Sequence, residues 1–221
     1  MAKVSNQLLP DGAKSIAVVV AHPDDEVLWA GGLILANAER RWSVLSTCRG
    51  SDPDRAPKFR RVLAELGAHG AMADLDDGQA QAPLSPRQVE DVLRGLWPSS
   101  SIDLILTHGP QGEYTRHRRH EEVCRAVVAL WRGGAIRAEE LWMFAFDDGN
   151  RAYLPRADAN APIRFEPTAD VWGAKYRLIT EIYGFAPESW EARVTPRKEA
   201  FWRFRSPEEA EKFIKEREPR E

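Results

Sequence analysis

The stretch Ile16-Ala-Val-Val-Val-Ala21 runs directly into His22-Pro-Asp-Asp-Glu26, and this junction decides the fold. Six consecutive apolar residues, rich in β-branched side chains and ending in a polar turn, are typical of a strand that is buried on both faces. Burial on both faces indicates a parallel sheet. After the turn, apolar residues recur at helical spacing, which predicts a helix over about residues 26–40 with acidic residues at its positive end.

Strands and helices alternate along the rest of the chain. The apolar patterns predict strands over residues 42–48, 102–107 and 141–146, and helices over 58–66, 86–96, 121–131 and about 174–183. Ser85 is placed to cap the helix over 86–96, Gly67 is placed to end the helix over 58–66, and 49–57 is expected to be a loop. Such alternation is typical of a doubly wound α/β sheet that is mostly parallel and carries helices on both faces.

Length and composition describe an ordinary globular protein. The 221 residues predict a single domain, which we expect to span residues 1–205, with a charged tail or helix over 206–221. The formal net charge of −3 offers no electrostatic footprint for nucleic acid or for acidic membranes. The longest purely apolar run, residues 16–21, is far shorter than the roughly 18 residues of a membrane span. Residues 1–14 lack the apolar core of a secretory signal, so we expect a cytoplasmic location.

Two polar clusters follow predicted strands. His22-Pro-Asp-Asp-Glu26 follows the first strand, and a segment running from Gly112 through His117 to His120 follows the strand that ends at Thr107. Open α/β sheets bind ligands at the carboxyl ends of their strands, so the clusters are expected to meet across one crevice. The chain has only two cysteines, so a metal must be held by imidazoles and carboxylates. This donor set suits zinc, or ferrous iron, with a position left for water.

The spacing within each cluster suggests which residues bind the metal and which act on the water or the substrate. His22 and Asp25 bracket a tight turn in which a proline fixes one backbone angle, so both side chains can converge on one ion. Asp24 must then point elsewhere, which is where a general base acting on an acidified water belongs. His117 and His120 share a helix face, so one can bind the ion while the other faces the substrate. His108 is expected to be a structural hydrogen-bonding residue rather than a fourth ligand.

The string Ala21-His-Pro-Asp-Asp-Glu26, followed by Gly31-Gly32, Thr107-His108 and His117-x-x-His120, resembles the PIG-L (LmbE-like) family of zinc-dependent N-acetylglucosamine deacetylases. The similarity covers roughly residues 15–205. It implies a Rossmann-like sheet and the hydrolysis of an acetamide on an aminosugar.

The resemblance also implies roles for particular residues. Three of them are the zinc ligands of the family pattern: His22, Asp25 and His120. The base of the family corresponds to Asp24, and its acid and oxyanion stabiliser corresponds to His117. Three further residues are expected to contact the substrate, namely Tyr114, Arg55 and Asp77.

The sequence departs from the family pattern around His117. The common motif is His-Pro-Asp-His with a tyrosine two residues before it, whereas here the interior is Arg-Arg and the tyrosine stands three residues before. The carboxylate that normally orients the acid histidine is therefore missing locally. Either Glu113, Glu121 or a residue of another loop replaces it, or the histidine works with a different pKa. Arg118 and Arg119 indicate either an anionic portion of the substrate, such as a phosphate, or a solvated surface pair.

These observations predict a zinc-dependent enzyme that removes the N-acetyl group from a small N-acetylated sugar or its conjugate, with no nucleic-acid partner and no membrane span. Homo-oligomers are common among small enzymes, which is the only ground for expecting one here. One alternative is a metal-dependent amidase acting on a non-sugar N-acyl compound. Another is a non-catalytic module that binds a metal or a sugar. Asp24, which metal binding alone does not require, favours the enzyme.

Overall fold

Strand β1 (Ser15–Val20) lies inside a seven-stranded sheet in the computed structural model, which describes residues 8–114 and 116–217. All six of its residues are buried, as the apolar run predicts. The strand pairs in parallel with β2 (Arg41–Ser46) on one side and with β4 (Leu104–Thr107) on the other. Two further parallel strands extend these pairs, β3 (His69–Met72) beside β2 and β5 (Glu140–Phe144) beside β4.

The strand order is β3-β2-β1-β4-β5-β9-β8. The last two strands, β9 (Glu199–Phe204) and β8 (Ile163–Phe165), run antiparallel to their neighbours. A separate short ribbon pairs β6 (Phe146–Asp147) with β7 (Arg156–Ala157). The doubly wound, mostly parallel, Rossmann-like sheet that the sequence predicts is therefore confirmed.

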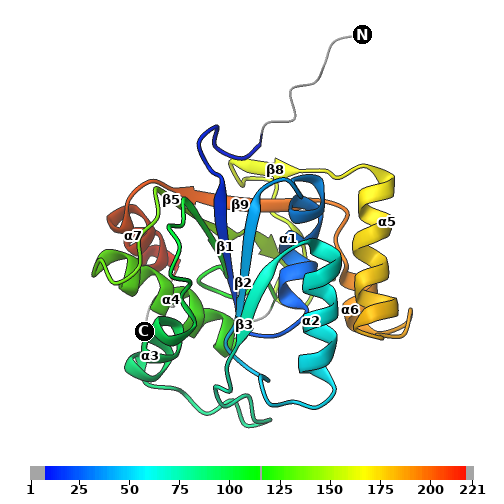
Figure 1. Ribbon diagram of the computed structural model, residues 1–221, viewed down its shortest axis with the longest axis horizontal. Helices are drawn as coiled ribbons and strands as arrows, with labels where there is room; N and C mark the ends of the chain where they lie inside the picture. The colour runs from blue at the N-terminus through cyan, green and yellow to red at the C-terminus, as the bar shows by residue number, and fades with distance from the viewer. Residues whose placement is uncertain (1–7, 115, 218–221) are drawn as a thin grey trace.

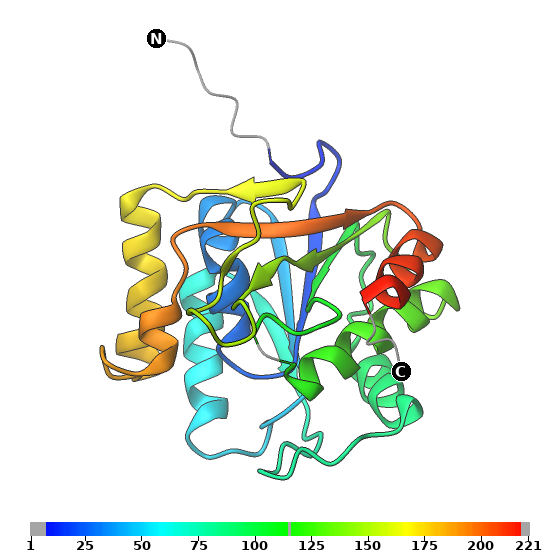
Figure 2. The same ribbon diagram turned by 180° about the vertical axis from the view of Figure 1, so that it is seen from behind.

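Helices cover both faces of the sheet (Figures 1 and 2). One face carries α1 (Asp25–Ala36), α2 (Arg55–Leu66), α5 (Ala169–Arg177), the π-helical turn η1 (Leu178–Ile182) and α6 (Trp190–Val194). The other face carries α3 (Pro86–Leu96), α4 (Arg118–Arg132) and α7 (Pro207–Arg217). Among the described residues, no helix has the length and apolar character that a membrane crossing requires.

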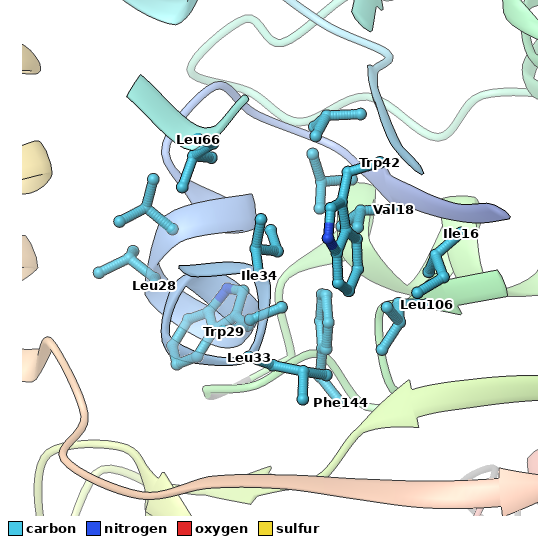
Figure 3. Packing of buried hydrophobic residues seen from close by; sticks show 14 of the residues in the cluster. Ile16, Val18, Leu28, Trp29, Leu33, Ile34, Trp42, Leu66, Leu106 and Phe144 are labelled. Carbon is cyan, nitrogen blue, oxygen red and sulfur yellow. The ribbon is translucent and has the colours of Figure 1, made fainter. Parts of the chain in front are cut away.

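The alternation of side chains along β1 explains the two layers. Ile16 and Val18 point to the face covered by α1 and α2, where they pack with Trp42 and other large side chains (Figure 3). Ala17 and Val19 point to the opposite face and pack beneath α3 and α4. Successive residues of a strand face opposite sides of a sheet, so one apolar run builds both cores.

The ends of several elements differ from the prediction. The first helix ends at Ala36 rather than near residue 40, because Asn37 leaves the helical conformation with φ at −132°. The second begins at Arg55 rather than at 58, since Pro57 sits in the first turn, where a missing N–H costs nothing. Strand β2 ends at Ser46 instead of 48, beyond which the chain turns into the loop before α2. The Gly67 helix end and the Ser85 cap are confirmed.

The later elements also shift. Helix α4 begins directly after His117 instead of at residue 121 and ends at Arg132. Strand β4 begins at Leu104 instead of at 102. The strand predicted over 141–146 is interrupted after Phe144, where the backbone leaves β9 and starts the β6–β7 ribbon. The helix predicted over 174–183 is α5 followed by η1, and it begins early because the Thr168 hydroxyl caps its first turn.

The charged segment after residue 205 forms α7 over most of its length. Ala210 and Ile214 on this helix are buried against the core that α4 helps to form. Residues 218–221 lie outside the described part of the chain, and the domain limit at residue 205 stays a prediction.

The topology brings the two polar clusters together. Strands β1 and β4 are neighbours. From β1 the strand order continues through β2 toward one edge of the sheet, and from β4 it continues through β5 toward the other edge. Such a point, where the strand order reverses, leaves a crevice at the carboxyl ends of the strands. The turn after β1 and the segment before α4 both lie there.

Candidate metal and catalytic site

Three predicted ligand atoms form a near-equilateral triangle. His22 Nδ1, Asp25 Oδ2 and His120 Nε2 are 3.3 Å apart along each edge. Donor atoms about 2.05 Å from a tetrahedrally coordinated ion lie roughly 3.3 Å from one another. The two imidazoles and the carboxylate therefore fit a divalent transition metal in both spacing and chemistry.

Each of the three side chains has a second partner that orients it. The contacts are 3.0 Å between Asp25 Oδ1 and Trp29 Nε1, 3.0 Å between His22 Nε2 and Asp77 Oδ1, and 2.5 Å between His120 Nδ1 and Glu113 Oε2. Outer hydrogen bonds of this kind fix the orientation and tautomer of metal ligands. The triangle is thus held in place by the protein itself.

His108 lies beside the triangle but is committed to other contacts. Its Nε2 accepts the N–H of Ala21 at 2.9 Å, so its Nδ1 carries the proton and donates to Glu113 Oε2 at 2.8 Å. Ligand atoms of His108, Asp25 and His120 do come within 4.8 Å of one another. Because both ring nitrogens of His108 are already used, its geometry matches the structural role expected from the sequence.

The electrostatics of the cluster are those of a cation site. Burial by itself would lower the pKa of His120, but the carboxylates of Asp25 and Glu113 raise it to about 10. Burial also opposes ionisation of Glu113, yet His108 and His120 bring its pKa down to about 2. Carboxylates that place a proton on a buried imidazole would equally stabilise a divalent cation at that point.

Asp24 lies beside the triangle of ligand atoms but is not part of it. Its Oδ2 lies 3.3 Å from Arg55 Nη1, and its carboxylate lines a cavity of about 470 Å³ together with His22 and His117. Burial, and then the neighbouring Asp25 carboxylate, raise the pKa of Asp24 well above its usual value. A carboxylate of raised pKa beside a metal site is suited to accept and return a proton.

His117 lies next to the ligands. It is the N-cap residue of α4, and its ring centroid is 4.2 Å from that of His120 and 4.9 Å from that of His22. Burial, followed by the charges of His120 and His22, lowers the pKa of His117 to about 3. The imidazole is therefore neutral at physiological pH.

The carboxylate expected to orient His117 is not found among residues 8–114 and 116–217. Glu113 contacts His108 and His120, and Glu121 pairs with Arg116 at 3.0 Å. The Nδ1 atom of His117 is buried, and none of the described residues is its hydrogen-bond partner.

The two arginines inside the second motif have different environments. Arg119 is fully buried, and its guanidinium donates to the carbonyls of Asp76 and Ala82 and pairs with Glu122. It is thus neither a surface residue nor a substrate contact. Arg118 is exposed and lines a second cavity, of about 620 Å³.

The residues expected to contact the substrate all line the first cavity. Tyr114 packs on Trp190, with ring centroids 4.5 Å apart, and Arg55 contacts Asp24. Asp77 is already engaged: its carboxylate contacts His22 and accepts two hydrogen bonds from Arg49, at 2.7 and 2.9 Å. Although burial acts in the opposite direction, these contacts hold the pKa of Asp77 far below its usual range.

Several residues of the cavity walls were not predicted from the sequence. Gln81 donates to Asp77 Oδ1 at 2.8 Å, and Arg49 binds the other oxygen of that carboxylate. Both belong to loops without a recognisable pattern, so no signal in the sequence could have found them. Trp190 lies in the wall that the two cavities share.

The fold and the site define a Rossmann-like α/β protein with a His/Asp metal-type centre at the strand switch point. The PIG-L family model, described as GlcNAc-PI de-N-acetylase, matches residues 17–131, just over half of the chain. This protein belongs to that family, and the matched range contains the triangle, Asp24 and His117.

Comparison with individual proteins agrees with this assignment. A 1D-myo-inositol 2-acetamido-2-deoxy-alpha-D-glucopyranoside deacetylase of Corynebacterium kroppenstedtii is 30% identical over 155 residues, and the match covers 50% of this chain and 40% of the relative. The chain thus spans less than half the length of that relative.

Solved structures share the fold at low sequence identity. The N,N'-diacetylchitobiose deacetylase of Pyrococcus horikoshii matches with a TM-score of 0.65 and 16% identity, covering 88% of this chain and 85% of that one. A teicoplanin deacetylase, described in a zinc-inhibited form, matches with a TM-score of 0.58 and 12% identity, covering 77% and 84%. These likenesses concern the fold alone.

Proposed function

We propose that this protein is a metal-dependent hydrolase that removes the acetyl group from an N-acetylated aminosugar or its conjugate. The observation that carries the proposal is the 3.3 Å triangle of ligand atoms with a separate carboxylate, Asp24, in the same cavity. A binding module needs the triangle but has no use for the second carboxylate. Membership of the de-N-acetylase family and the named activity of the Corynebacterium relative support the choice of substrate.

The metal would be held by His22, Asp25 and His120. Once bound, it would polarise the acetamide carbonyl and lower the pKa of a water molecule. Two imidazoles and one carboxylate suit Zn²⁺ best, and Fe²⁺ is the second candidate. Because a teicoplanin deacetylase of the same fold has a zinc-inhibited form, activity should be compared with each of these metals.

The chemistry is assigned to two side chains, of which Asp24 carries the proton. Asp24 accepts a proton from the attacking water, and Arg55 holds its carboxylate in position at 3.3 Å. His117, which is neutral, donates a hydrogen bond to the carbonyl oxygen as negative charge develops there. When the C–N bond breaks, the proton on Asp24 passes to the departing nitrogen. Acetate and a free amine are the products.

The second cavity would take the part of the substrate beyond the acetylated sugar. It joins the first at Gln81, Tyr114, His117 and Trp190, so a conjugate can extend from one cavity into the other. Its walls include the exposed Arg118 and Arg151. Their charge favours a conjugate that carries a phosphate or a carboxylate.

The first test is acetate release from a panel of N-acetylglucosamine conjugates, with and without phosphate, by protein loaded with Zn²⁺ or Fe²⁺. We expect Asp24→Asn to keep the metal but to lose roughly two to four orders of magnitude in kcat. His120→Ala should lose the metal and the activity together. Two exposed residues supply matched controls, Asp91→Asn and His69→Ala, and both variants should behave like the wild type.

Other outcomes would favour the alternatives. Turnover of simple acylated amines, with no turnover of any sugar, would indicate an amidase for non-sugar substrates. Calorimetric binding of an acetylated sugar without turnover under either metal would indicate a binding module. A metal-free His120→Ala protein with full activity would contradict the proposed site.

A further inference from the structure

Asp24 has an unusual backbone conformation. Its φ is 128° and its ψ is −28°, in a region that residues with a side chain rarely adopt. Such conformations cost free energy and persist only where surrounding contacts enforce them. The turn between β1 and α1 therefore needs something that holds Asp24 in this state.

The backbone of Asp24 is held by a buried hydrogen-bond relay. Glu26 Oε2 accepts the N–H of Asp24 at 3.0 Å, and Glu26 Oε1 accepts the hydroxyl of Tyr183 at 2.5 Å. Glu26 is fully buried and Tyr183 is 2% exposed. The tyrosine therefore fixes the carboxylate that in turn fixes the strained peptide.

The side chain of Asp24 is supported from the same segment. Arg55 Nη1 lies 3.3 Å from Asp24 Oδ2, and the Arg55 guanidinium sits 4.4 Å above the ring centre of Phe185. Stacking on an aromatic face restricts an arginine to one position. Tyr183 and Phe185 thus reach the two ends of the same residue, one through Glu26 and the other through Arg55.

The segment that supplies these two rings is itself held in an uncommon form. It follows the π-helical turn η1, where the N–H of Tyr183 bonds to Leu178 O at 3.0 Å and that of Phe185 to Ile179 O at 3.2 Å. Between the rings, Gly184 has a φ of 77°. π-Helical turns are rare and often occur at functional sites. In Figure 1 this segment continues from the lower end of α5, and Tyr183 belongs to the core on the face of the sheet that α1 and α2 cover.

We propose that Tyr183 and Phe185 are positioning residues that hold Asp24 in its strained conformation, with its carboxylate fixed for proton transfer. The segment lies outside the matched range 17–131, so the family pattern does not assign it. The catalytic consequence rests on the proposed function, whereas the conformational one does not. The two can therefore be tested separately.

The conformational test needs no substrate. Asp24→Gly and Asp24→Ala both remove the carboxylate, but only glycine adopts a φ near 128° without strain. In metal-loaded protein, we expect the glycine variant to melt at least about 2 °C above the alanine variant. Adding Tyr183→Phe should abolish this difference, because residue 24 can then relax, whereas Tyr176→Phe on α5 should leave it intact.

The catalytic test uses the conjugate that the wild type cleaves best. Tyr183→Phe and Phe185→Leu should each lower kcat by roughly 10- to 100-fold, with KM and metal content unchanged within twofold. Phe185→Tyr keeps the ring beneath Arg55, so this variant should have the kcat of the wild type. A purely structural role would instead lower the melting temperature and leave kcat of the folded fraction unchanged.

The results separate the two claims. If no substrate is cleaved by the wild type, the proposed function fails, while the melting experiment still decides the positioning claim. An alanine variant that is at least as stable as the glycine variant would overturn that claim. So would a Tyr183→Phe protein with wild-type kcat.

Discussion

Replacing Arg119 with methionine should weaken metal binding although Arg119 touches none of the proposed ligands. Its buried guanidinium closes the loop over residues 76–82 onto α4, through the carbonyls of Asp76 (2.5 Å) and Ala82 (2.8 Å). The same loop carries Asp77, whose carboxylate contacts His22 Nε2 at 3.0 Å. We call these two hydrogen bonds of Arg119 the clasp. Without the clasp, Asp77 should become free to move and should no longer orient His22, a proposed metal ligand.

The magnitude follows from the contacts that are lost. Hydrogen bonds to a charged donor contribute about 1.5–3 kcal/mol each. Arg119 also pairs with Glu122, and removing one partner of a buried ion pair costs about 3–5 kcal/mol. Because Asp76 and Ala82 are exposed residues, we expect water to reach their carbonyls once the guanidinium is removed. We therefore expect Arg119→Met to lower the free energy of unfolding by about 3 kcal/mol. Losing the orienting contact to His22 should weaken metal affinity by roughly 10- to 100-fold.

Two assays keep these effects apart. Urea unfolding in the presence of a chelator measures the loss of stability without the metal. Competition with a chromogenic chelator, in native buffer, measures the affinity for zinc. Arg118→Met, at the neighbouring exposed position, is the matched control and should change neither quantity. Asp77→Asn should show the same loss of metal affinity but should keep most of the stability of the wild type.

A folded Arg119→Met protein that binds zinc as tightly as the wild type would contradict this link between Arg119 and the metal site. Equal affinity would show that the loop keeps its position without the clasp. A loss of affinity in Arg119→Met but not in Asp77→Asn would show that the clasp acts by another route.

Three further predictions concern stability. Lys175 and Glu199 form a fully buried ion pair (2.7 Å), so Lys175→Met should lower the urea-derived free energy of unfolding by about 3–5 kcal/mol, and a loss below 1 kcal/mol would contradict this. Ser85 completes a capping box on α3, so Ser85→Ala should cost about 1 kcal/mol in the same assay without altering activity. Although burial opposes it, the hydrogen bond from Arg203 holds the pKa of Glu140 below 4.5. The stability from this pair is therefore present above about pH 4.5 and is lost as the pH falls below it. In Glu140→Gln, the free energy of unfolding should decrease less steeply at acid pH than in the wild type. An unchanged decrease would contradict this prediction.

The central strands were predictable because each carries its own signal. β1, β4 and β5 are short apolar runs bounded by turns, and burial on both faces follows from their composition. β3 was missed because its sequence, His-Gly-Ala-Met, has neither an apolar run nor an alternating pattern. It forms a strand because β2 offers a free edge to pair with, which is a tertiary effect.

The proposed ligands could be found from the sequence because the motif that holds them is local. His22 and Asp25 are three residues apart, and His120 follows a strand that any reading of the chain detects. Their supports could not be found in this way. Glu26 and Tyr183 are separated by 157 positions, and Asp77 reaches His22 across 55 positions from a loop without a pattern. Contacts of that kind are decided by how the elements pack.

The departure at the second motif has a consequence for the chemistry. Arg119, where the family pattern has a carboxylate, instead binds the loop over residues 76–82, and the buried Nδ1 of His117 has no hydrogen-bond partner among the described residues. With a pKa near 3, lowered first by burial and then by the neighbouring imidazoles, His117 is a neutral imidazole at physiological pH, which can donate a hydrogen bond but does not act as an acid. A cation bound beside it would lower that pKa further. In the proposed reaction, return of the proton to the departing amine is therefore assigned to Asp24, whose pKa is raised by burial. In that proposal, a residue that both takes and returns the proton has to keep one position throughout, and the contacts at both ends of Asp24 are suited to hold it there.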